Sequence, residues 1–168
     1  TPVVDGNLVF LTAGDGAGSE LLKLTSADGA TTAEAVYGPN KLMVNQHGGV
    51  VRIGDHAYGY TDNGGKWLCF EWKKNADEPV WESKELDKGS VSAADGHLYL
   101  YGQSKGTCVL AEASPAGYAE KGRLELPAKS EFPRGQGAIW AHPVIANGKL
   151  YLRDYELLYV YDVGAAAP

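Results

Sequence analysis

Val91-Ser92-Ala93-Ala94-Asp95-Gly96-His97-Leu98-Tyr99 is the stretch of sequence that decides the fold. Two short apolar runs flank Asp95-Gly96, and this pair is a strong signal of a tight hairpin because both residues accept positive φ. The same pattern occurs at residues 2–10, 50–58 and 143–151. The turn residues Gly6, Asp55, Gly96 and Gly148 are 49, 41 and 52 residues apart. Repeats of about 40–50 residues are typical of four-stranded propeller blades.

Each repeat continues beyond its hairpin with further apolar runs. A third run follows at residues 21–24, 67–70, 108–110 and 157–160, and three repeats add a fourth run at residues 33–37, 80–84 and 122–126. No stretch of about 10–12 residues repeats apolar side chains at helical spacing. The sequence therefore predicts an all-β fold, a β-propeller of about four four-stranded blades. We place the blades at residues 2–38, 48–86, 88–127 and 141–163 of one domain, the last blade lacking its outer strand.

The last repeat has no fourth run, because Tyr161-Asp162-Val163 leads directly into Gly164-Ala165-Ala166-Ala167-Pro168. Natural proteins avoid unpaired strand edges, so we expect this edge to be covered. The chain is then the C-terminal half of a longer propeller, or a half-ring completed by a second copy. Four blades that close on themselves are a third arrangement, at the low end of the known range.

Composition and charge exclude several classes of protein. With 44% hydrophobic and 10% aromatic residues the chain has the material for a core, so intrinsic disorder is excluded. Its 15 Lys and Arg against 21 Asp and Glu leave a net charge of −6, so we expect no nucleic-acid partner. No apolar run approaches the roughly 18 residues of a membrane helix, so we expect no membrane insertion. Cys69 and Cys108 lie in strand patterns and are predicted to be buried thiols.

Candidate ligand-binding residues lie in loops that a propeller places at one mouth of its central channel. His47 and His142 precede innermost strands, and Trp140 belongs to the long connection over residues 128–142, which also carries Arg134. Long loops on rigid scaffolds are where binding residues collect. The predicted site comprises His47, Lys88, Trp140, His142, Arg153 and Asp154. We predict no catalytic residue and no metal ligand, because no zinc, EF-hand or nucleophile-elbow spacing occurs.

Structural interpretations compete with binding at these positions. His47 and His142 are also suited to a hydrogen bond across a junction between blades. Trp140 either fills the space between blades, which we favour, or stacks on a planar ligand. Arg153 and Asp154 are also suited to an ion pair that orders the last loop.

Several segments resemble a known family. His47-Gly48-Gly49-Val50-Val51, Glu112-Ala113-Ser114-Pro115-Ala116-Gly117-Tyr118 and the stretch from His142 to Asp154 resemble the C-terminal half of bacterial pyrroloquinoline-quinone-like (PQQ-like) β-propeller proteins. These include quinoprotein alcohol dehydrogenases and the BamB-type outer-membrane assembly lipoproteins. The dehydrogenases use a catalytic Asp, a calcium ion, a stacking Trp and a vicinal Cys pair. None of these motifs can be placed in this sequence.

The resemblance implies a periplasmic or otherwise extracytoplasmic protein. Our leading hypothesis is a non-catalytic binding or scaffold module whose loops meet a protein or small ligand. The first alternative is part of a PQQ-dependent dehydrogenase, in which His47, Lys88, Trp140 and His142 would line the site of the quinone and its calcium. The second alternative is a half-ring that homodimerises into an eight-bladed propeller. The expected partner is accordingly the missing half of the propeller or a second copy.

Overall fold

The computed structural model describes residues 2–133 and 138–164, which form fifteen strands and contain no helix. The strands build four antiparallel sheets, and each sheet is a simple meander in chain order. The predicted all-β fold is therefore confirmed. Sheet 1 consists of β1 (Val3–Asp5), β2 (Leu8–Ala13), β3 (Gly18–Ala27) and β4 (Ala30–Asn40). Sheet 2 consists of β5 (Val50–Ile53), β6 (His56–Thr61), β7 (Lys66–Glu71) and β8 (Trp81–Ser83).

Sheets 3 and 4 repeat this order of strands. Sheet 3 consists of β9 (Gly89–Ala94), β10 (His97–Gly102), β11 (Thr107–Glu112) and β12 (Glu120–Glu125). Sheet 4 consists of β13 (Val144–Ala146), β14 (Lys149–Asp154) and β15 (Leu157–Asp162). Three sheets thus have four strands, and sheet 4 has three within the residues that the structure describes.

The first hairpin of every sheet closes through two residues, as the turn signals predict. Asp95 and Gly96 take φ of 48° and 73°, the left-handed conformation that a tight turn between twisted strands requires. Pairing of Asp5 with Leu8 makes Asn7, not Gly6, the equivalent of Asp55. The first interval between equivalent turn residues is therefore 48 residues rather than 49, because Gly6 lies one residue before the true equivalent of Asp55.

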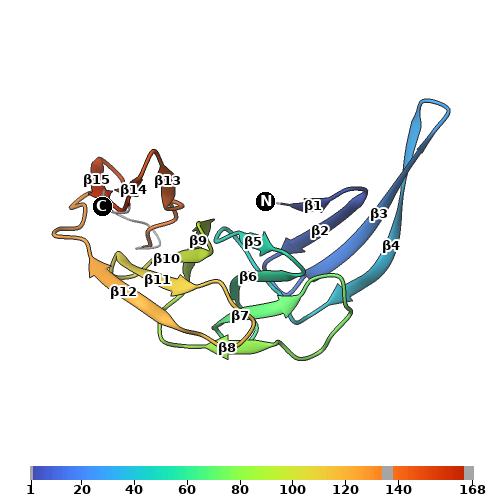
Figure 1. Cartoon of the computed structure of the whole chain (residues 1–168), viewed down its shortest axis with the longest axis horizontal. Helices are drawn as coiled ribbons and strands as arrows, with labels where there is room; N and C mark the ends of the chain where they lie inside the picture. The colour runs from blue at the N-terminus through green and yellow to red at the C-terminus, as the bar shows by residue number, and fades with distance from the viewer. Residues whose placement is uncertain (1, 134–137, 165–168) are drawn as a thin grey trace.

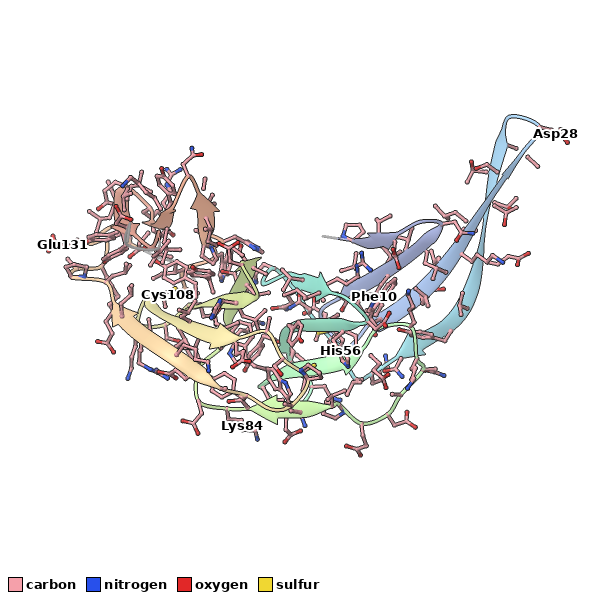
Figure 2. The ribbon with its side chains drawn as sticks, in the orientation of Figure 1. Phe10, Asp28, His56, Lys84, Cys108 and Glu131 are labelled. Atoms are coloured by element: carbon pink, nitrogen blue, oxygen red, sulfur yellow. The ribbon has the colours of Figure 1, made fainter. Side chains whose placement is uncertain are left out.

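The second hairpin of sheet 1 is longer than the apolar runs indicate. β3 and β4 stay paired to Ala27 and Ala30, and the turn uses Asp28 and Gly29 with φ of 52° and 76°. Its outer part is polar and exposed, so hydrophobic patterning does not reveal it. Figure 2 shows Asp28 at the tip of this arm, which projects away from the rest of the molecule.

The four sheets follow one another along an arc (Figure 1). The first strand of each sheet lies on the concave side and β4, β8 and β12 lie on the convex side. Successive first strands contact one another, β1 with β5, β5 with β9, and β9 with β13. Hydrogen bonds also join neighbouring units, among them Val91 N to Gly48 O at 3.0 Å and Ser90 Oγ to Ala141 O at 2.7 Å.

The core lies between successive sheets as three apolar clusters. Phe10 and Leu68 belong to the cluster between sheets 1 and 2, and Trp67 and Leu98 to that between sheets 2 and 3. The third cluster, between sheets 3 and 4, includes Tyr101. Such face-to-face packing follows from the period-2 alternation of each strand, which directs successive side chains to opposite faces.

One position repeats as an aromatic residue in all four sheets. Phe10, Tyr58, Tyr99 and Tyr151 each occupy the third residue of the second strand. In sheets 1 to 3 this ring packs in the cluster shared with the next sheet. No sheet follows Tyr151 within residues 2–133 and 138–164, and its ring stays half-buried.

Both cysteines are free and buried, as predicted. Cys69 faces sheet 3 and Cys108 faces sheet 4, so each thiol lies in a different cluster. Burial raises the pKa of Cys69 to about 11 and that of Cys108 to about 12. Both side chains therefore act as small apolar core residues.

Candidate functional site

A tight backbone approach positions the two candidate histidines. His142 donates from Nε2 to the carbonyl oxygen of His47 at 2.8 Å. The His142 ring rests on Gly49, whose φ is +75° and where an added Cβ would lie 2.8 Å from His142 Cε1. Glycine is therefore required beside this ring. The hydrogen bond joins the connection before sheet 2 to the connection before sheet 4, so the predicted structural bond across a junction is present.

The His47 side chain is the centre of a cluster on the loops. Its Nε2 donates to Gln103 Oε1 at 3.2 Å, and its ring lies 5.0 Å from that of Trp140 with an interplanar angle of 40°. Burial, and next the nearby Lys88 ammonium group, lower the pKa of His47, although Gln103 partly opposes them. The folded protein therefore favours the neutral imidazole.

Lys88 lies beside this cluster, and its ammonium group belongs to a polar network. Its Nζ pairs with Asp62 Oδ1 at 2.7 Å and also donates to Gln46 Oε1. Gln46 Nε2 in turn donates to Asp15 Oδ1 at 3.0 Å. These side chains come from sheets 1, 2 and 3 and their connections, so the network spans three sheets at the same end of the molecule.

Trp140 does not fill a space between sheets. Its side chain is 52% exposed and contacts His47 with one part of the ring system. A ring that plugged a gap between sheets would be buried, so the packing role that we favoured is wrong. Trp140 instead lines a pocket of about 340 Å³, together with Ala138, Ile139, Ala141, Arg153, Asp154 and Tyr155.

Arg153 and Asp154 both line this pocket, but their side chains point in different directions. They are neighbours on β14, so their side chains leave the strand on opposite faces. Arg153 is exposed and donates from Nε to Tyr155 O at 2.7 Å, whereas Asp154 is 1% exposed and accepts from Ser130 N at 2.9 Å. Between these two described residues there is no ion pair, so that expectation is wrong.

The structure thus places the six sequence-predicted residues at one end of the sheets. His47, Lys88 and His142 form a polar cluster, and Trp140 links that cluster to the pocket that holds Arg153 and Asp154. Arg134 lies outside the described residues. Sequence reasoning missed Gln103, because a polar residue in the short loop between β10 and β11 carries no signal of its own. Its main chain also holds the site together, since Gln103 O accepts from Ile139 N at 2.9 Å.

The described residues contain no cluster of typical metal ligands. Within residues 2–133 and 138–164, no three His, Cys, Asp or Glu side chains gather closely enough to hold a metal ion. Cys69 and Cys108 lie in different clusters, so they do not form a vicinal pair.

Comparison with known proteins does not identify the chain. No protein-family model matches it, and no curated protein matches it in sequence. Within the part that the structure describes, no helix is long and apolar enough to cross a membrane.

Proposed function

We propose that the four sheets are radial blades of a PQQ-like β-propeller and that the chain is a non-catalytic binding module of an exported protein. Three observations support the radial arrangement. The sheets are consecutive meanders, three of four strands and one of three, their first strands contact one another on the concave side of the arc, and one aromatic position recurs in every sheet (Figure 1). Placement outside the cytoplasm rests on the resemblance to exported propellers, and secretion of the parent protein would test it.

The binding surface of this module is the pocket beside Trp140. The carrying observation is a tryptophan ring that is 52% exposed and yet held in place by His47 at the rim of a 340 Å³ pocket. An exposed, fixed aromatic ring offers an apolar face at little cost in conformational entropy. Arg153 adds a positive charge at the same pocket. This chemistry suits a small ligand that has a flat or ring-shaped apolar face and an anionic or hydrogen-bonding edge.

The hydrogen bonds of the two histidines give them a positioning role beside the pocket. His47 Nε2 is engaged with Gln103, and His142 Nε2 is engaged with the main chain of His47. Both Nε2 atoms face oxygen acceptors, so each carries its ring's N–H and serves to hold the cluster beside Trp140.

A thermal-shift screen of the chain with sugars, aromatic carboxylates and PQQ with calcium tests the proposal. We expect a shift with one class of compound, at least a tenfold loss of affinity for it in Trp140→Ala, and partial retention in Trp140→Phe. Val80→Ala, at a 42% exposed position on a different connection, is the matched control. Binding that is unchanged in Trp140→Ala, or no binding by any class, would refute the proposal. Tight PQQ binding that depends on Trp140 would favour the quinoprotein alternative.

A further inference from the structure

Within residues 2–133 and 138–164, no other sheet covers the apolar sheet faces at the two ends of the arc (Figure 1). On sheet 4 the pairing of Val144 with Tyr151 and of Tyr151 with Val160 puts these side chains on one face, with Leu158 two residues from Val160. Val144, Leu158 and Val160 are 53%, 59% and 49% exposed. We call this surface the last end face. An exposed apolar patch of this kind marks a site of interaction.

The outward side of sheet 1 is the first end face. Val4 pairs with Val9 and Val9 with Leu22, so the three share one face, and Leu11 and Leu24 follow at alternate positions. Val4 is 58% exposed, and the other four are half-buried. The opposite side of this sheet carries Phe10 and Leu21 and is covered by sheet 2.

The two end faces carry residues at the same strand positions as the residues that meet at the internal interfaces between sheets. At each internal interface, the recurring aromatic residue of one sheet lies in the same cluster as a residue of the next sheet. That residue is the second one in the next sheet's second strand. These pairs are Phe10 with Ala57, Tyr58 with Leu98, and Tyr99 with Leu150. Tyr151 holds the aromatic position of sheet 4 and lies on the last end face. Val9 is the second residue of β2 and lies on the first end face. One chain therefore carries both halves of a fourth interface of the same kind.

We propose that the last end face of one copy packs on the first end face of a second copy, and that two such contacts close two arcs into one ring of eight sheets. The inference rests on the radial arrangement proposed above. Head-to-tail contacts form a closed ring when their rotation closes and a filament when it does not. The sheets curve in one direction and the end sheets lie at opposite ends of the arc, which favours closure (Figure 1).

Charge is also complementary between the two faces. Arg153 follows Tyr151 by two residues and so shares the last end face, at the end of β14 that leads to the β14–β15 turn. Glu20 pairs with Leu11 on the first end face, at the equivalent end of sheet 1. Packing of the two faces in the register of the internal interfaces brings these opposite charges to the same level. An ion pair at the edge of an interface contributes chiefly to register and specificity.

Sedimentation and light scattering of the full chain over a tenfold concentration range test this inference. We expect a mass of about twice 17.9 kDa. Val4→Glu and Leu158→Glu should each raise the dissociation constant of the dimer at least tenfold, because each buries a charge against an apolar face. Val80→Glu, which lies on neither end face, should leave it unchanged. Circular dichroism melts of every variant separate lost association from lost folding.

A mixture of two variants distinguishes a head-to-tail contact from other dimers. Val4→Glu combined with Leu158→Lys should associate more tightly than either variant alone, since each mixed pair keeps one unaltered contact and places opposite charges at the other. A dimer that Leu158→Glu weakens but Val4→Glu does not would overturn the proposal in favour of a symmetric contact. A folded wild-type monomer at all concentrations would also overturn it. In that case, ligand binding that depends on Trp140 would still support the proposed function.

Discussion

The imidazole of His142 donates a hydrogen bond to the carbonyl oxygen of His47, across 2.8 Å of space and 95 residues of chain. The bond joins the connections that enter sheets 2 and 4, so the chain between the two residues contains all of sheets 2 and 3. The same two residues frame Trp140, which packs on the ring of His47. The hydrogen bond from His142 Nε2 to the His47 carbonyl oxygen thus helps to position the exposed Trp140.

Replacing His142 should loosen the Trp140 pocket more than it destabilises the fold. We expect His142→Ala to cost about 0.5–1.5 kcal/mol of unfolding free energy, the usual net value of one hydrogen bond. His142→Gln, which keeps a donor, should recover part of it. Acrylamide quenching of tryptophan fluorescence should rise in His142→Ala, because Trp67 and Trp72 are buried at 2% and 0% exposure and half-buried Trp81 gives the same background in both proteins. Unchanged quenching would contradict the assigned role of His142.

Stability should depend on the protonation of His47. Folding lowers the pKa of this imidazole, chiefly through burial and then through Lys88, so the unfolded chain binds the proton more readily. The contribution of His47 is therefore fully present above its ordinary pKa of about 6.5 and is lost as the pH falls through the folded value. Urea midpoints of wild type and His47→Gln should converge between pH 7.5 and pH 5. Parallel pH profiles of the two proteins would contradict this prediction.

Replacing equivalent aromatic residues with alanine should cost different amounts of unfolding free energy, according to what covers each ring. Tyr58 is 2% exposed between sheets 2 and 3, whereas Tyr151 has no sheet over it in the described structure. We expect Tyr58→Ala to cost about 3–5 kcal/mol, the range for a large buried aromatic side chain. Tyr151→Ala should cost less than about 1 kcal/mol at concentrations where the chain is monomeric. Equal losses in dilute urea titrations would show that Tyr151 is covered within one chain.

Neither thiol should react in the folded protein. The pKa values of Cys69 and Cys108 are raised to about 11 and about 12, and both side chains are buried. Because the thiolate is the reactive form, reaction with a disulfide reagent at pH 8 should be on the order of a hundredfold slower than in urea. Two equivalents should react after unfolding. Rapid labelling of the native chain would mean that one sheet interface opens readily.

Much of the fold was accessible from local sequence. Alternating apolar residues and turn pairs such as Asp95-Gly96 act over a few residues, so they predict strands and hairpins directly. The errors arose where that signal is weak. The arm around Asp28 is polar on both faces, and the first turn offered two candidate positions in Gly6 and Asn7.

The candidate site was predicted as a set of loop residues but not as a set of contacts. His47 and Trp140 were chosen separately, and their ring contact depends on how sheets 2 to 4 stack. Gln103 was missed because a polar residue in a short turn carries no signal of its own. The supposed ion pair of Arg153 with Asp154 failed because neighbouring strand residues point to opposite faces.

By itself the sequence determined the strands, their order and the loops that carry polar and aromatic residues, because period-2 alternation and turn chemistry are short-range properties. Only the tertiary structure decided which side chains meet. The pocket beside Trp140, the polar network of Lys88 and the exposed faces of sheets 1 and 4 all depend on the packing of one sheet on the next. That packing is set by the shapes of apolar faces from segments some 40–50 residues apart, which no local pattern encodes.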